Sequence, residues 1–113
     1  MSVTPARARK IALALPDASE APNFDRAAFR TPRRIFATLA PDGASMNLAF
    51  NADLQEFWCE HEPEAFAPVP GGWGRMGYTT CRLRVVDEAA FKSALSAAHA
   101  LASTPTKKKS RRK

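Results

Sequence analysis

The chain has 113 residues, 45% of them hydrophobic, and a formal net charge of +6. This length fits a single domain with its own core, and the hydrophobic fraction is too high for a disordered chain. No apolar run approaches the ~20 residues that a membrane-spanning helix needs. The N-terminus also lacks the apolar segment of a signal peptide, so we expect a cytoplasmic protein with no membrane partner.

The positive charge is concentrated at one end of the sequence. Six of the 17 Lys and Arg residues fall within residues 107–113, which leaves 11 basic against 11 acidic residues elsewhere. The six are Lys107, Lys108, Lys109, Arg111, Arg112 and Lys113. A basic run without apolar residues is typical of a disordered segment that attracts nucleic acid. We therefore predict a single domain over residues 1–102 and a disordered basic tail over residues 103–113.

The first element in chain order is a helix. Thr4 and Pro5 are typical of a helix start, and Pro16 ends the helical pattern. Between them, four apolar residues fall on one helical face: Ala8, Ile11, Ala12 and Leu15. A short strand is predicted next, over residues 24–30.

A β-hairpin around Pro41-Asp42-Gly43 is the strongest local signal, because this tripeptide favours a tight turn. Alternating residues flank the turn on both sides. Before it, over residues 34–39, the residues predicted to share one face are Ile35, Ala37 and Leu39. After it, the corresponding residues are Met46, Leu48 and Phe50.

The second half of the chain predicts a helix, a loop, a strand and a final helix. Asn51 can cap a helix whose apolar stripe consists of Leu54, Phe57, Trp58 and His61. Residues 62–77 are rich in Pro and Gly and predict a loop with a short extended piece over 65–69. A strand over residues 78–85 would place on one face Thr79, Cys81, Leu83 and Val85.

Asp87 can cap the final helix. The apolar stripe of this helix comprises Phe91, Ala94, Leu95, Ala98, Leu101 and Ala102. The predicted order is thus α-β-β-β-α-β-α. Strands joined by short turns favour an antiparallel sheet with the terminal helices packed on it, so the predicted class is α+β.

The sequence indicates no catalytic or metal-binding constellation, and we predict a protein that is not an enzyme and has no cofactor or metal. The two histidines, His61 and His99, lie on or beside apolar helical stripes and are expected at the edge of the core. Cys59 and Cys81 are far apart and match no zinc spacing. We expect two free thiols, with a disulfide as the less favoured alternative.

Two segments are candidate binding sites. In residues 71–77, glycines let the backbone approach a ligand, Trp73 offers a stacking surface, and Arg75 offers a forked donor for phosphate or a base edge. The alternative is an ordinary loop whose tryptophan covers the core. Arg33 and Arg34, near Arg26 and Arg30 in sequence, can bind phosphates or form ordinary surface charge.

The order and spacing of several stretches, together spanning roughly residues 6–102, resemble a known family. The most specific is residues 68–79, Pro-Val-Pro-Gly-Gly-Trp-Gly-Arg-Met-Gly-Tyr-Thr. The others are residues 15–20 (Leu-Pro-Asp-Ala-Ser-Glu), 23–24 (Asn-Phe), 28–30 (Ala-Phe-Arg) and 34–39 (Arg-Ile-Phe-Ala-Thr-Leu). With these features the chain resembles the MmcQ/YjbR family. It departs from the family pattern at Asn23, where His is common, at Tyr78, where Trp is common, and at Asp25, which replaces Gly before Arg26.

The resemblance implies an antiparallel sheet between terminal helices and a DNA-binding role through a double-wing arrangement of β-elements. It implies no catalytic residues and no cofactor. The favoured interpretation is a DNA-binding, bacterial protein whose candidate contacts are Arg33, Arg34, Trp73, Arg75 and the six basic residues of the tail. The alternative is a module that binds a protein or a small ligand through the glycine-rich loop around Trp73.

Overall fold

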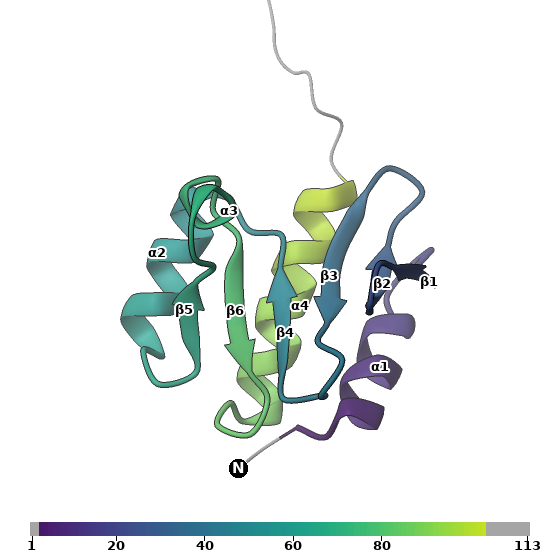
Figure 1. The fold of residues 1–113 in the computed structure, drawn as a ribbon, viewed down its shortest axis with the longest axis horizontal. Coiled ribbons are helices and arrows are strands. Elements are labelled where there is room, and N and C mark those ends of the chain that lie inside the picture. Colours follow the sequence, from purple (N-terminus) through teal and green to yellow (C-terminus); the bar gives the residue numbers. More distant parts are fainter. Residues whose placement is uncertain (1–2, 104–113) are drawn as a thin grey trace, which may run out of the picture.

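A computed structural model describes residues 3–103 as a six-stranded antiparallel sheet with the three longer helices packed on one side (Figure 1). The first elements are α1 (Pro5–Leu13), β1 (Ser19–Asn23), β2 (Arg26–Arg30), β3 (Ile35–Leu39) and β4 (Ser45–Leu48). The remaining elements are α2 (Ala52–His61), β5 (Phe66–Pro68), α3 (Gly72–Arg75), β6 (Thr79–Arg82) and α4 (Glu88–Ser103). The strand order across the sheet is β1-β2-β3-β4-β6-β5. The predicted α+β class and antiparallel sheet are confirmed.

The helix starts predicted from the sequence are confirmed by their capping hydrogen bonds. The side chain of Thr4 accepts from the N–H of Arg7, and that of Asn51 accepts from the N–H of Leu54. The Asp87 carboxylate accepts from the N–H of Ala90. Each cap satisfies a backbone donor that the first helical turn leaves without a partner, so these starts depend on local sequence.

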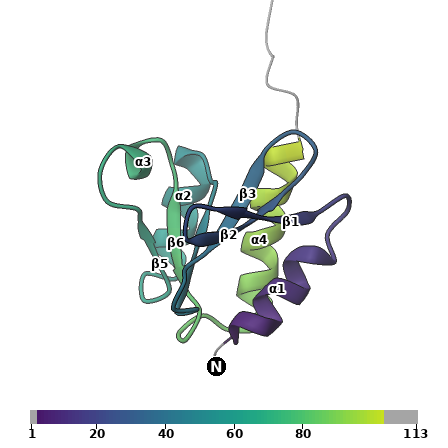
Figure 2. The same ribbon diagram turned by 45° about the vertical axis from the view of Figure 1, so that its right-hand side comes forward.

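One face of the sheet carries the core. Met46 and Leu48 of β4 are fully buried, and so are Phe91 and Leu95 of α4, which belong to the same core cluster. Ala8 and Ala12 bring α1 into the same core, while Trp58 of α2 packs against Phe66 of β5, with ring centroids 5.1 Å apart. Figure 1 shows α4 behind β3 and β4, and Figures 1 and 2 show α1 beside α4, below β1 and β2. The opposite face of the sheet is therefore not covered by these three helices.

The prediction that Ile35 shares a face with Ala37 and Leu39 is wrong, because a β-bulge interrupts the pairing of β2 with β3. The pairing of β2 with β3 shifts between Phe29 and Arg30, so Arg30 lies opposite Ile35 while Phe29 lies opposite Ala37. Phe36 is the extra residue and takes the core position, where it is fully buried and meets the ring of His99 edge to face. Ile35 is thereby turned to the open face, although Ala37 and Leu39 are buried as predicted.

The strand predicted over residues 24–30 begins later, at Arg26. Phe24 and Asp25 form the tight turn of a β1–β2 hairpin in which Asn23 is paired with Arg26. The sequence analysis missed β1 because its five residues, Ser-Glu-Ala-Pro-Asn, show no apolar alternation. β1 is an edge strand that forms by antiparallel pairing with β2.

The second half of the chain differs from expectation in three places. β6 ends at Arg82, so Val85 is 44% exposed and Val86 takes the buried position instead. His61 is exposed rather than at the core edge, with its ring stacked on Phe57 at 4.2 Å. Within the predicted loop, the extended piece is β5, and residues 72–75 form the short helix α3.

Helix α4 ends at Ser103, and the basic run of residues 107–113 lies outside the described residues. No helix in residues 3–103 is both long and apolar enough to cross a membrane.

The ion pair between Arg7 and Glu88 joins α1 to the start of α4. Arg7 Nε and Nη2 donate to the two carboxylate oxygens of Glu88 at 2.9 and 2.8 Å, and Lys92 Nζ lies 3.5 Å from the same carboxylate. The hydrogen bond from Arg7 is the main reason that the pKa of Glu88 is lowered from its ordinary 4.5 to about 2.

We expect Glu88→Gln to remove a small, pH-dependent part of the stability. A carboxylate with a lower pKa in the folded state stabilises the fold above pH 4.5 and loses this contribution as the pH falls toward 2. The effect is small because both side chains are about 40% exposed. Urea unfolding at pH values of about 7, 4 and 2.5 measures it. The difference between variant and unchanged protein should shrink with falling pH, and a constant difference contradicts the prediction.

The two cysteines are free thiols in different surroundings. Cys81 is fully buried, and burial raises its pKa to about 12. Cys59 on α2 is half-buried, and burial also raises its pKa. Because the thiolate is the reactive form, we expect a thiol reagent to modify Cys59 slowly in the native protein and Cys81 only after unfolding. Mass spectrometry of the native and unfolded protein checks this, and native modification of Cys81 contradicts it.

Candidate functional site

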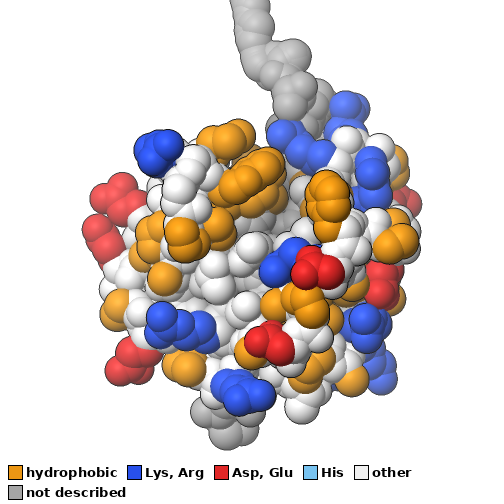
Figure 3. All heavy atoms as spheres, in the orientation of Figure 1, with side chains coloured by type: hydrophobic (Ala, Val, Ile, Leu, Met, Phe, Trp, Pro, Cys, Tyr) orange, Lys and Arg blue, Asp and Glu red, His pale blue; other side chains and the backbone are white. Residues whose placement is uncertain are grey.

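The open face of the sheet contains a groove of about 280 Å³, which we call the open-face groove. Figure 3 shows this side of the molecule, with hydrophobic side chains on both sides of a hollowed central area. The groove is lined by Asn23, Phe24, Arg26, Ile35, Ala37, Thr38, Asn47, Ala49, Val69, Trp73 and Tyr78. These residues come from the β1–β2 hairpin, β3, β4 and the segment around α3, so only the folded sheet brings them together.

One wall of the groove is the β1–β2 hairpin, which Figure 2 shows crossing in front of the sheet. The bulge at Phe36 accounts for this course, since an extra residue bends a strand and increases its twist. At the tip of the hairpin, Phe24 is 98% exposed and has a φ of 60°. The hairpin therefore presents a bare aromatic ring beside the groove.

The opposite wall is the segment that contains α3. Its Trp73 is 59% exposed and meets Tyr78 edge to face, with ring centroids 5.1 Å apart. Gln55 of α2 holds this segment in place, because its side-chain amide donates to the carbonyls of Gly74 and Tyr78 at 2.9 and 3.0 Å. The wall is thus a supported surface that carries two aromatic rings.

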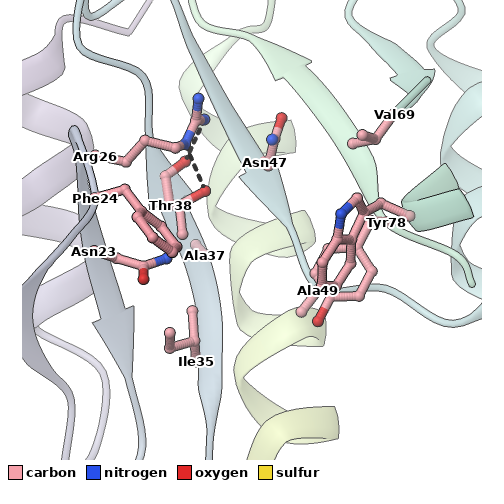
Figure 4. A pocket seen from close by; sticks show the side chains of 11 residues that line it. Asn23, Phe24, Arg26, Ile35, Ala37, Thr38, Asn47, Ala49, Val69 and Tyr78 are labelled. Carbon is pink, nitrogen blue, oxygen red and sulfur yellow. Dashed lines mark hydrogen bonds between the residues drawn. The ribbon is translucent and has the colours of Figure 1, made fainter. Parts of the chain in front are cut away.

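The floor supplies hydrogen-bond donors (Figure 4). Arg26 Nε donates to Thr38 Oγ1 at 3.0 Å and its Nη2 to the Thr38 carbonyl at 3.2 Å, which uses two of the five N–H groups of the guanidinium. Thr80 Oγ1 donates to Asn47 Oδ1 at 2.8 Å, so the amide N–H groups of Asn47 are left for a ligand. Of the described residues that line the groove, Arg26 is the charged one.

The predicted basic residues lie outside the groove, at one end of the sheet. Arg33 and Arg34 are exposed in the β2–β3 turn, and their backbone N–H groups donate to Thr31 Oγ1. The same hydroxyl donates to the carbonyl of Ala102 at 3.3 Å. Ser103, the last described residue, therefore lies close to this turn.

The four site residues predicted within the fold do not form one cluster. Trp73 and Arg75 lie on α3, and Arg33 and Arg34 lie in the β2–β3 turn on the other side of the open face, at the same end of the sheet (Figures 1 and 2). Of these four, Trp73 is the one that lines the groove. Arg75 is exposed and has no ion pair among the described residues.

Sequence reasoning missed Phe24, Tyr78 and Asn47 as site residues. Phe24 was placed in a strand, although Pro22-Asn23 before it and Asp25 after it are turn-forming residues that signal the hairpin tip. Nothing in the sequence indicates that Asn47, in the middle of an alternating strand, faces a groove. It is recognisable only once the register of β4 with β3 and β6 is known.

Within residues 3–103, no acidic or histidine side chain is among the residues that line the open-face groove. Asp25, beside Phe24, lines a different hollow that it shares with Pro5 and Arg9. His99 Nε2 lies 2.7 Å from the carbonyl of Pro16 on the helical side of the sheet. No group of three His, Cys, Asp or Glu residues within residues 3–103 is placed to hold a metal ion. The described lining of the groove is aliphatic, aromatic, amide, hydroxyl and cationic.

The fold and the site together define an α+β protein with one covered and one open sheet face. The YjbR family model matches residues 13–101, and the chain belongs to the YjbR family. A solved structure, the crystal structure of Deinococcus radiodurans protein DR2400 (domain DUF419), shares the fold with a TM-score of 0.70. The two sequences are 18% identical, and the similarity covers 86% of this chain and 76% of that one. Comparison with curated proteins gives no match.

Proposed function

We propose that this chain binds DNA through the open face of its sheet, without catalysis, in the cytoplasm. The observation that carries the proposal is the composition of the open-face groove, whose lining combines exposed aromatic rings with donor groups and a cation but has no carboxylate among the described residues. Aromatic rings and cationic donors are the groups that stack on bases and bind phosphates. A carboxylate in the groove would repel the phosphate backbone.

Cations outside the groove support the same proposal. Arg33 and Arg34 lie on one side of the open face and Arg75 on the other, all exposed. The last turn of α4 lies near Arg33 and Arg34, and in the sequence the basic run of residues 107–113 follows this helix. Several cations at one end of the sheet can contact successive phosphates, each contact adding to the salt dependence of binding.

Titration of fluorescent DNA, as duplex and as single strand, tests the proposal. The proteins are the full chain, a chain that ends at Ser103, and the full chain with Arg33→Ala, Arg34→Ala and Arg75→Ala. Affinity of the unchanged protein should fall at least about tenfold between roughly 50 and 200 mM salt. The shortened chain should retain measurable binding, and the triple variant should have a smaller salt slope. Binding that disappears completely with the basic run overturns the role proposed for the fold.

A small planar ligand is a second candidate, and the size of the groove favours it. At about 280 Å³, the groove is near the lower end of the ~300–1,000 Å³ typical of small-molecule sites. This candidate would be favoured over DNA if a free nucleoside bound as tightly as an oligonucleotide. The nucleoside binding should then be lost in Trp73→Ala and retained in the chain that ends at Ser103.

A further inference from the structure

We infer that the open-face groove binds unpaired bases of single-stranded DNA, which stack on Phe24 and Trp73 while Arg26 and Asn47 donate hydrogen bonds to the base edges. The inference rests on the proposed function, because it specifies which form of DNA the open face takes.

The conformation of Phe24 gives the first argument. A positive φ at the first residue of a two-residue hairpin turn is usually occupied by glycine, and a bulky residue there is strained. Phe24 has this φ, at 60°, and it is 98% exposed, so its ring gains almost no packing within the fold. A strained and bare aromatic ring at the mouth of a groove is the arrangement expected of a ligand contact.

The form of the groove gives the second argument. Bases in a duplex are stacked and show their edges and not their faces, whereas the bases of a single strand can turn their faces toward aromatic side chains. Rings from both walls, Phe24 on one side and Trp73 with Tyr78 on the other, line a space of about 280 Å³. This space suits one or two unpaired bases and is too small for a double helix.

The polar floor gives the third argument. The free N–H groups of Arg26 and the amide of Asn47 are donors, so they match the acceptor atoms of base edges. Thymine has a carbonyl oxygen and no exocyclic amine on its major-groove edge, and guanine has two acceptors there. An oligothymidylate is therefore the probe that this floor fits, and it has the further advantage of forming no duplex with itself.

The exposed cations around the groove complete the match. Arg75 lies on α3, Arg33 lies in the β2–β3 turn at the same end of the sheet, and the groove itself contains Arg26. A strand whose bases enter the groove would have its phosphates near these guanidinium groups. Charge complementarity thus favours a polyanionic strand over a neutral apolar partner.

The test is a titration of the full chain with an oligothymidylate of about 12 nucleotides, within the ~4–16 that a small single-strand-binding fold covers. The chain has two tryptophans, so Trp58→Phe leaves Trp73 as the reporter. We expect the fluorescence of Trp73 to be quenched and the oligothymidylate to bind at least about tenfold more tightly than its duplex with oligoadenylate. Fluorescence anisotropy of a labelled oligonucleotide with the unchanged protein gives the same comparison independently of the Trp58 substitution.

Three variants locate the binding. Phe24→Ala removes a stacking ring and should weaken binding about 5- to 150-fold. Ala49→Leu fills the groove from its floor and should also weaken binding, without changing a charge. Phe57→Ala is the matched control, because Phe57 is an exposed aromatic residue on α2, away from the groove, and it should leave the affinity unchanged.

The outcomes separate the inference from the proposed function. Duplex binding as tight as that of the single strand, or unchanged affinity of Phe24→Ala and Ala49→Leu, overturns the inference. In those cases the proposed function stands if the triple variant with Arg33→Ala, Arg34→Ala and Arg75→Ala still loses affinity for DNA. If the protein binds neither duplex nor single-stranded DNA, both the inference and the proposed function are overturned.

Discussion

Replacing Gly74 with alanine is expected to destabilise the protein by about 1–3 kcal/mol, the usual cost of forcing an extra group into a packed region. Gly74 is buried within α3, and a Cβ atom at this position would lie 1.8 Å from the carbonyl oxygen of Val69. The obstacle is backbone, so the segment must shift to accommodate the methyl group. Such a shift disturbs the bond from the Gln55 side chain to the Gly74 carbonyl and the bond from Val69 N–H to the Tyr78 carbonyl.

The expected fall in melting temperature is roughly 5–20 °C for a domain of this size, measured by circular dichroism. Gly72→Ala is the matched control in the same helix, because its Cβ would have Arg75 Nη2 as its nearest neighbour at 3.7 Å, an ordinary contact. That variant should melt within a few degrees of the unchanged protein. Equal melting temperatures for the two variants would falsify the close approach of α3 to Val69.

DNA binding of Gly74→Ala should also weaken, since Trp73 and Tyr78 form one wall of the open-face groove and depend on the position of this segment. Gly72→Ala should bind as the unchanged protein does. The comparison connects the fold of the glycine-rich segment with the proposed function of the groove.

The second large effect is expected from Phe24→Gly, which should stabilise the fold while it weakens binding. A non-glycine residue in the left-handed region costs about 1–2 kcal/mol, and glycine gives back roughly 0.5–1 kcal/mol as extra entropy of the unfolded chain. Because Phe24 is 98% exposed, its removal sacrifices almost no packing. The net expectation is a gain of about 0.5–1 kcal/mol in the free energy of unfolding.

Affinity for the oligothymidylate should fall by about 5- to 150-fold in the same variant, because one stacking ring is lost. Thermal melting and anisotropy on the same preparation measure the two quantities. Opposite changes, with higher stability and lower affinity, are the signature of a residue kept for binding. A loss of both stability and affinity would instead show that Phe24 supports the hairpin, and it would remove the main argument for the ligand.

Local sequence signals were sufficient for the three longer helices and the central hairpin. Thr4, Asn51 and Asp87 cap the helices as predicted, and the apolar spacing of α4 is reproduced in its buried residues. These features depend on side chains within a few positions of one another. The α+β class follows from the order of such elements.

The places where prediction failed depend on distant partners. β1 has no strand pattern of its own and exists through its pairing with β2. The bulge at Phe36 depends on the core space beside His99, which lies more than sixty positions further along the chain. Val85 follows the predicted alternation but is exposed, because the chain turns at Leu83 to reach α4.

By itself the sequence determined the secondary structure of the three longer helices, the turn at Gly43 and the location of net positive charge, since each follows from neighbouring residues or composition. The tertiary structure decided which face of the sheet stays open and which side chains meet there. Phe24 and Arg26 come from the β1–β2 hairpin, Asn47 from β4 and Trp73 from α3, and no local pattern relates these three segments. They share a groove because the bulge between β2 and β3 bends the β1–β2 hairpin over the open face, and the close approach of Gly74 to Val69 brings the opposite wall to the same face.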